Sequence, residues 1–456
     1  MADHNLATPD IAAPGRQQGA PEPERGAPEP ERGAPEPERG VSQPATARWR
    51  RRLVVLGLVL AAVNLRPAVT SLGPLLEEVR ADLGMSGTVA GLLTSMPAAC
   101  FALFGIAAPR LARRWGPGAV VCAGLAAITA GLAIRPLVGG TAAFLAASAL
   151  TLAGIAVGNV LMPVIVKHWF PDRVGPMTGV YSMALSLGTA VAAAVTVPMT
   201  DALGGGWRAG LGVWAALAAV AVLPWPMLAR HRGGDGDRGR DRMPAAVPSS
   251  KAARTRITKS RTAWALAVFF GLQATAAYIT MGWMPQVFRD AGVSASTAGL
   301  LLAVTMVMGV PLSFVLPPLA ARLRSQGPLV AVLGSFGLAG YAGLWLAPAQ
   351  GAWVWAVLLG VSNCSFPLAL TMIGMRARTH AGVVRLSAFA QSTGYLLSIP
   401  GPLLVGALYQ HSGGWDLPIA LMAGLMVPQI AAGLLAGRDR TVEDEIDTGA
   451  APTAGR

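Results

Sequence analysis

Arg66 is the residue whose type and position most directly suggest chemistry, because it lies about thirteen residues into an apolar run over 53–76. Such a run can cross a bilayer, since roughly 20 helical residues span the hydrocarbon core. An arginine near the bilayer centre costs at least about 2.5–3.5 kcal/mol, so it normally faces a watery cavity or a partner. This predicts a site for a negative or strongly polar ligand. The structural alternative is an arginine that binds carbonyls of a neighbouring helix.

Further polar side chains interrupt the apolar runs at helical spacing. Thr70 shares the Arg66 face, and a continuous stripe runs from Ser387 to Ser398, because residues three or four apart lie on one face of a helix. A looser hydroxyl stripe lies over 178–189. We expect it either to pack closely against a neighbouring helix or to contact the substrate. Asn159 and Asn363 each precede a proline by four residues, where they can satisfy carbonyls freed at a kink and line the cavity. The predicted substrate-binding residues are Arg66, Asn64, Thr70, Gln273, Tyr278, Gln391, Tyr395, Asn159 and Asn363.

The composition predicts the elements that must position these residues. The chain of 456 residues is 53% hydrophobic and 13% charged. Soluble domains have a charged share of about 25%, so we expect an all-α integral membrane protein. Twelve apolar runs predict twelve transmembrane helices: 53–76, 87–108, 117–136, 141–166, 175–200, 209–229, 263–288, 295–318, 328–347, 352–375, 385–410 and 416–436.

Charge in the loops predicts the orientation. The net charge of +13 comes almost entirely from arginine, which clusters in every second loop. This is the positive-inside pattern and not a nucleic-acid surface, so we expect both termini in the cytoplasm of a multi-pass protein of the inner (plasma) membrane. A Pro/Glu repeat of seven residues over 19–39 predicts a disordered tail at 1–52. A basic cytoplasmic linker is expected at 230–262 and a second tail at 437–456.

A duplication divides the chain into six-helix halves at 53–229 and 263–436. At an offset of 208 residues, Gly205-Gly206-Trp207 matches Gly413-Gly414-Trp415, and three further blocks align at the same offset. Two halves of like topology joined by a cytosolic linker are typical of the major facilitator fold, in which the substrate binds at the midplane between the halves. Alternating access is the expected mechanism.

Several strings resemble the cyanate and 2-nitroimidazole transporter family within that superfamily. The most specific is the first-span string over 64–76, and the resemblance continues at 92–97, 162–163, 269–273 and 389–395. It covers about 53–436 and implies transport of a small polar or anionic solute such as cyanate or a nitroimidazole. Because arginine binds carboxylates in a bidentate manner, small carboxylates are also expected candidates.

The loop after the second span departs from the superfamily pattern. Arg113 replaces the aspartate of the usual Gly-x-Leu-Ala-Asp-Arg motif. This puts the charge-relay gate of other branches in doubt. We nevertheless expect a gating loop that contains Arg110, Arg113, Arg114 and Arg322.

Other functions are less well supported. Multidrug efflux is an alternative, favoured by seventeen methionines but opposed by Ala192-Ala193, where an antiporter pattern requires Gly-Pro. A transporter-like membrane sensor is the alternative of another class. We expect no enzyme, cofactor or metal site, because the histidines are scattered and no carboxylate lies inside the spans. The expected partners are a small-molecule substrate and the lipid bilayer, with protons as an open question, and the protein is expected to be a monomer that binds no nucleic acid.

Overall fold

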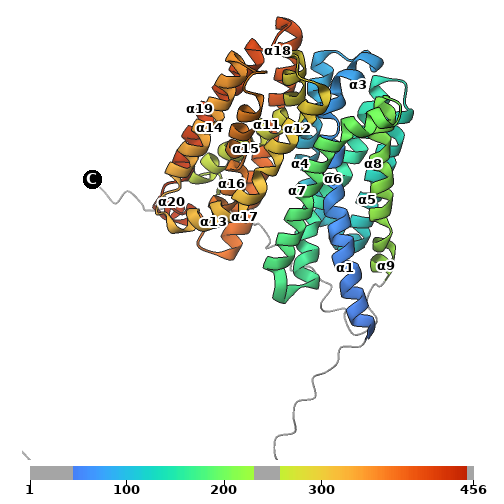
Figure 1. Cartoon of the computed structure of the whole chain (residues 1–456). Helices are drawn as coiled ribbons and strands as arrows, with labels where there is room; N and C mark the ends of the chain where they lie inside the picture. The colour runs from blue at the N-terminus through green and yellow to red at the C-terminus, as the bar shows by residue number, and fades with distance from the viewer. Residues whose placement is uncertain (1–44, 231–256, 449–456) are drawn as a thin grey trace, which may run out of the picture. The chain divides into compact units, whose positions relative to one another are not determined.

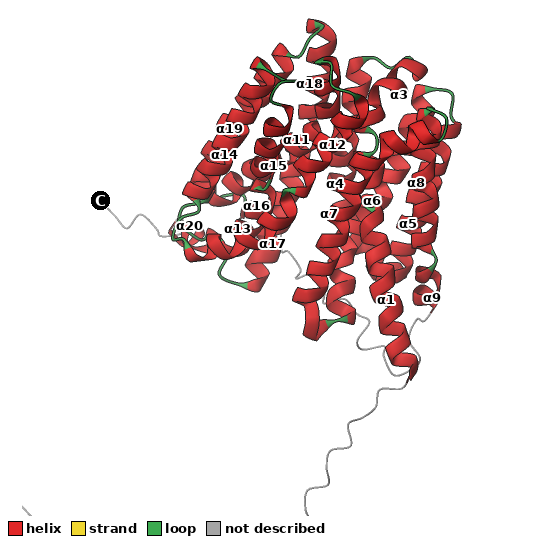
Figure 2. Cartoon of the chain, in the orientation of Figure 1, coloured by secondary structure: helices red, strands yellow, loops and turns green. Residues whose placement is uncertain are grey.

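The computed structural model describes residues 45–230 and 257–448, and these residues form helices joined by short loops, without a strand (Figure 2). Residues 1–44 of the tail predicted at 1–52, most of the linker (231–256) and the end of the second tail (449–456) lie outside the described residues. Residues 45–52 were expected to be disordered but belong to the first helix. Met1–Ala47 and Arg48–Arg456 are separate units, and the helices described below belong to the second unit, apart from the first residues of α1.

The helices follow one another in two series (Figure 1). The first series contains α1 (Ala45–Asn64), α2 (Pro67–Thr70), η1 (Gly73–Leu75), α3 (Leu76–Leu83), α4 (Gly87–Trp115), α5 (Pro117–Ile134), η2 (Arg135–Leu137), α6 (Thr141–Trp169), η3 (Pro171–Arg173), α7 (Val174–Ala202), α8 (Trp207–Val222) and α9 (Pro224–Arg230). The second contains α11 (Arg261–Asp290), α12 (Ala295–Val307), α13 (Gly309–Arg322), α14 (Gly327–Leu346), α15 (Ala352–Asn363), α16 (Ser365–Met375), α17 (His380–Ser398), α18 (Pro400–Ser412), α19 (Asp416–Ala436) and α20 (Val442–Thr448).

Eleven helical stretches in the described residues are long and apolar enough to cross a membrane, and each overlaps a predicted span. The predicted span at 385–410 is not among them. It is divided at Ile399 into α17 and α18. Ile399 keeps helical dihedral angles (φ −59°, ψ −47°), and the ladder of helical hydrogen bonds is interrupted because Pro400 has no N–H to donate. Polar residues such as Gln391 also lower its hydropathy. Twelve spans therefore remain a prediction.

The first span is broken where the sequence predicted a continuous helix. α1 ends at Asn64, and α2 begins at Pro67 after a turn that contains Arg66. Proline at the first helical position lacks an N–H and restricts the residue before it, so the helix restarts there. Arg66 has φ −123° and ψ −31° and precedes α2. The expectation that Arg66 lies on an uninterrupted helix is therefore wrong.

Glycines bring the two series into close contact at one end of the bundle. A Cβ atom added to Gly406 of α18 would lie 2.2 Å from the Gly87 carbonyl oxygen of α4, and one added to Gly73 would lie 2.2 Å from the Met281 carbonyl oxygen of α11. Such backbone approach is typical of small residues in membrane helices. α12 packs on α7 as α18 packs on α4, which is the pairing that an internal duplication predicts.

Polar contacts join the same ends of the helices. Trp283 donates to Thr94 at 3.1 Å, Arg289 forms an ion pair with Glu78 at 2.9 Å, and the Thr88 amide donates to Gln410 at 3.0 Å. We call this region, formed by residues 73–94, 281–299 and 402–415, the closed end. It holds the two series together on one side of the bundle.

Candidate substrate-binding site

A cavity of about 290 Å³ lies between the two series. Three interruptions in the helices meet at its wall: the turn at Arg66, the junction of α12 and α13 near Gly309, and the junction of α15 and α16 at Asn363–Cys364. Irregular backbone at membrane depth is tolerated where it lines a cavity. The polar residues and cysteine that line the cavity are Arg66, Ser182, Ser186, Thr189, Tyr278, Ser313, Asn363, Cys364 and Tyr395.

Arg66 is half-buried and surrounded by three tyrosines. Tyr278, Tyr181 and Tyr395 all lie within electrostatic range of its guanidinium. The Tyr395 ring stacks on Phe101 with the ring centroids 5.1 Å apart, which fixes the phenol at the cavity wall. None of the described residues that line the cavity is acidic. The arrangement presents a positive charge without a carboxylate of the protein beside it.

A hydroxyl stripe from α7 forms the opposite polar wall. Ser182, Ser186 and Thr189 line the cavity, whereas Thr178 of the same predicted stripe does not. The Thr189 hydroxyl donates to the Leu185 carbonyl at 2.7 Å. Its oxygen is therefore left to accept a hydrogen bond from a ligand, since a hydroxyl has one proton and two lone pairs. The sequence did not decide whether this stripe packs against a helix or contacts the substrate. In the structure, Ser182, Ser186 and Thr189 of the stripe belong to the cavity surface.

Gln273 acts on Asn363 and does not line the cavity. Its amide nitrogen donates to the Asn363 side-chain oxygen at 2.7 Å and to the Asn363 carbonyl at 3.1 Å. Its own oxygen accepts from Gln429 at 2.8 Å. Asn363 ends α15, where its carbonyl has lost its helical partner, so this buried amide chain satisfies the break and orients Asn363. The sequence predicted Gln273 as a ligand and did not indicate Gln429 at all.

Four other predicted ligands lie outside the cavity lining. Asn64 donates to the Leu60 carbonyl at 2.8 Å, Thr70 to the Arg66 carbonyl at 3.1 Å, and Asn159 to the Ile155 carbonyl at 2.9 Å. Gln391 donates to the Ser387 hydroxyl at 2.6 Å. Each of these side chains thus donates to a group four residues earlier, in its own helix or in the adjoining turn. Asn159 also accepts from Tyr181 at 3.3 Å, so it supports one of the tyrosines near Arg66.

The predicted gating arginines are exposed at the ends of two helices. Arg110, Arg113 and Arg114 lie in the last two turns of α4, and Arg322 ends α13. Arg110 donates to the Ile106 carbonyl at 2.9 Å, and the Arg114 guanidinium lies 5.5 Å from the Trp115 ring centroid. These contacts are local to α4, and a gating role stays a prediction.

In the part of the chain that the structure describes, no group of three or more His, Cys, Asp or Glu could hold a metal ion.

Membrane-length helices in two series, with a polar cavity between them, are the arrangement of a membrane transporter. Residues 58–399 match the Major Facilitator Superfamily, and the chain belongs to this family. It is a multi-pass membrane transporter of the branch that contains the cyanate and 2-nitroimidazole transporters. The resemblance inferred from the first-span string is thereby confirmed.

Relatives match over most of their length. The chain is 35% identical to the uncharacterized transporter YycB of Bacillus subtilis (85% of this chain, 94% of the relative). It is 32% identical to the 2-nitroimidazole transporter of Escherichia coli (86% and 97%) and 29% identical to its cyanate transport protein (82% and 95%). Among solved structures, the fold is similar to a bacterial homologue of the human lysosomal transporter Spinster, with a TM-score of 0.68 and 15% identity over 85% of this chain and 96% of that chain.

Proposed function

We propose that this transporter moves a small anion or a compact polar solute by alternating access, with Arg66 as the principal substrate-binding residue. The observation that carries this proposal is a half-buried arginine in a cavity lined from both series, with three tyrosines and no acidic lining residue near it. A buried guanidinium favours a planar anionic or strongly dipolar partner, because its donors form a fixed fork.

The cavity lining favours a compact solute. Apolar residues such as Met281, Met306 and Phe366 cover much of the wall, while the hydroxyls and Asn363 provide directional contacts. Cyanate is a linear anion and 2-nitroimidazole a flat, dipolar ring, and the relatives named for them match 82% and 86% of this chain respectively. Small carboxylates fit the same fork of donors and belong in the proposal.

The proposed topology has twelve spans, with α17 and α18 together as the eleventh and both termini in the cytoplasm of the inner membrane. In this orientation the closed end faces outward, and the cavity exchanges solute with the cytoplasm. Separation of the closed end, together with approach of the opposite helix ends and their arginines, would then expose Arg66 to the outside. The protein would act as a monomer, driven by a proton gradient or by the substrate gradient alone.

Efflux of large apolar drugs is the second candidate, favoured by the apolar part of the lining. A fixed cation opposes cationic drugs, since like charges repel in a site of low dielectric constant. A sensor would bind the same solute without transporting it. Transport assays separate these functions.

Uptake into proteoliposomes tests the proposal, with radiolabelled cyanate, formate, 2-nitroimidazole and a cationic dye, with and without a pH gradient. Saturable uptake of an anion or of the nitroimidazole is expected, and Arg66→Gln should reduce it about tenfold to hundredfold because a charge-assisted hydrogen bond is lost. Arg51→Gln, an exposed residue of the same span, is the matched control. Transport of the dye alone would favour efflux, and equal uptake by both variants would remove Arg66 from the site.

A further inference from the structure

Arg135 is a second arginine inside the bundle, and the transport site described above does not include it. It follows α5 and begins η2, and only 1% of its surface is exposed. Nε donates to the Ser148 hydroxyl at 2.9 Å, one terminal nitrogen donates to the Ala68 carbonyl at 2.9 Å, and the guanidinium lies 5.6 Å from the Phe144 ring centroid. No carboxylate of the described residues forms an ion pair with it. A buried charge without a counter-charge is costly, which points to an anionic partner.

A small cavity of about 20 Å³ adjoins this guanidinium. That volume is enough for one water molecule or one monatomic ion. Its wall contains Arg135, residues 68–73 of the broken first span, Thr94 and Pro97 of α4, and Tyr278 and Gly282 of α11. Both helix series therefore contribute to it, as they do to the central cavity.

Tyr278 lines the small cavity and the central cavity alike. The two arginines also act on the same short helix, because Arg66 precedes α2 and Arg135 binds the carbonyl of its second residue, Ala68. An anion leaving Arg66 past Tyr278 would therefore meet Arg135. The wall of the small cavity also contains Thr94 and Gly282, which approach each other and belong to the closed end.

We propose that Arg135 is a second anion-binding position, which a small inorganic or carboxylate anion occupies when the contact between α4 and α11 at Thr94 and Gly282 separates. The proposal rests on the proposed function, since it places a second position on the route of the same substrate. In the closed arrangement the cavity admits only a monatomic anion or water. Once the closed end separates, the anion binds Arg135 first and then passes Tyr278 to Arg66.

Sidedness of transport tests the proposal. Uptake of radiolabelled cyanate is measured in right-side-out and inside-out vesicles, which present opposite faces of the protein. Arg135→Gln should raise the half-saturating concentration about tenfold or more from the closed-end face, and less than about threefold from the cavity face, because only one route begins at Arg135. Arg135→Lys keeps the charge and should restore most of the affinity. Arg438→Gln, an exposed arginine just after α19, should change neither face.

Equal effects of Arg135→Gln on both faces, or an affinity that Arg135→Lys does not restore, would reduce Arg135 to a support of α2 and overturn the proposal. Crystals of the wild-type protein soaked in bromide provide a readout without transport. An anomalous peak within hydrogen-bonding distance of the Arg135 guanidinium is expected, and a peak at Arg66 alone, or no peak, would contradict it. If the wild-type protein transports no anion from either face, the proposed function fails, and the bromide result alone decides whether Arg135 binds anions.

Discussion

Two polar clusters lie at opposite ends of α11 and α19, and they differ in what they connect. At the closed end, Arg289 binds Glu78 and the Pro74 carbonyl of the other series. Asp290 beside it accepts from Tyr409 at 2.9 Å and from Trp415 at 2.8 Å. The Arg289 contacts bring the end of α11 onto the first span, whereas the Asp290 contacts hold it to α18 and to the start of α19.

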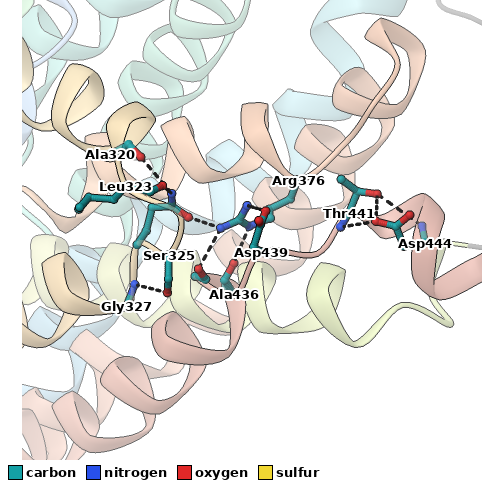
Figure 3. A network of polar contacts seen from close by, with 11 residues as sticks. Ala320, Leu323, Ser325, Gly327, Arg376, Ala436, Asp439, Thr441 and Asp444 are labelled. Atoms are coloured by element: carbon teal, nitrogen blue, oxygen red, sulfur yellow. Dashed lines mark hydrogen bonds and ion pairs between the residues drawn. The ribbon is translucent and has the colours of Figure 1, made fainter.

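At the other end, Arg376 joins helices of the second series only (Figure 3). It donates to the Ala436 and Gly437 carbonyls at 2.9 Å each and to the Gln326 side chain. Gln326 in turn donates to the Ala320 and Leu323 carbonyls at 3.0 Å. This Arg376 cluster thus satisfies the carbonyls at the ends of α13 and α19 and holds them to the end of α16.

Exposure separates the two clusters further. The Arg376 side chain is 3% exposed, whereas those of Arg289 and Glu78 are 22% and 35% exposed. A partly hydrated ion pair contributes little to the free energy of folding, so little free energy is needed to break it. Loss of a buried guanidinium that satisfies several carbonyls is strongly destabilising. If transport follows the proposed alternating access, the contacts between the series are therefore the ones expected to break, and the contacts inside one series the ones expected to persist.

The largest effect is expected at the Arg376 cluster. Arg376→Met should destabilise the protein by about 3–5 kcal/mol, because buried carbonyls lose their donor. Arg376→Lys should recover only part of this, since a lysine cannot reproduce the fork of donors. Thermal unfolding in detergent checks the ranking, with exposed Arg438→Met as the control. An unfolding temperature of Arg376→Met equal to that of Arg438→Met would show that the cluster does not hold the series together.

Gly406 is the next most sensitive position, because its α carbon faces the Gly87 backbone across the two series. The methyl group of Gly406→Ala should force α4 and α18 apart at a cost of about 1–3 kcal/mol, which favours the separated state and slows transport about tenfold. Gly424→Ala on α19, where an added Cβ meets nothing within 4 Å, should transport normally. The check is the initial transport rate together with hydrogen exchange of residues 73–94. Faster exchange only in Gly406→Ala supports the closed-end assignment, and identical exchange contradicts it.

The sequence predicted the spans well because membrane length and apolar composition are local properties. Pro67, which directly follows Arg66, also indicates the helix break at Arg66. The break was not predicted because the residues on both sides form one apolar run, which favours a continuous helix. Arg66, Tyr278, Tyr395 and Asn363 line the central cavity, and their contact with substrate stays a prediction.

The amides were harder to place, since the same side chain can face a ligand or satisfy a carbonyl of its own helix. Gln273 takes its role from Gln429, which is 156 residues away in sequence and comes close only through helix packing. Tyr181 was missed for a similar reason, because a single tyrosine in an apolar run gives no indication of the arginine beside it. The sequence likewise did not indicate that packing of α5 and α6 buries Arg135.

The Glu78–Arg289 pair should have a smaller effect than Gly406. Glu78→Gln or Arg289→Gln should change the transport rate about twofold to fivefold, because a partly exposed pair contributes no more than about 1 kcal/mol. The exchanged pair Glu78→Arg with Arg289→Glu should restore most of the rate. A double-mutant cycle on the rate measures the coupling. Additive single effects would mean that the closed end is held by helix packing and not by this pair.

The smallest expected effect concerns α20, which is attached to the start of α11 beside the Arg376 cluster. The Glu445 carboxylate accepts from the Ser260 hydroxyl at 2.7 Å and from the Thr262 hydroxyl at 2.8 Å. Burial of this carboxylate raises its pKa, but the hydrogen bonds from Ser260 and Thr262 outweigh burial and hold the pKa below the usual 4.5.

Because the pKa of Glu445 is lower in the attached state, its contribution is complete above about pH 4.5 and is lost as the pH falls through the lowered value. Protease cleavage after α20 should therefore accelerate in mild acid, below the usual pKa. Glu445→Gln should cleave faster at neutral pH and lose most of that acceleration. Asp439→Asn, an exposed acid 4.0 Å from Arg376, should behave as the wild type. Among the described residues, the hydrogen bonds that attach α20 are formed with the start of α11 and with the loop after α16. Transport should therefore change little in either variant, and a strong loss in Glu445→Gln would mean that this attachment takes part in the cycle.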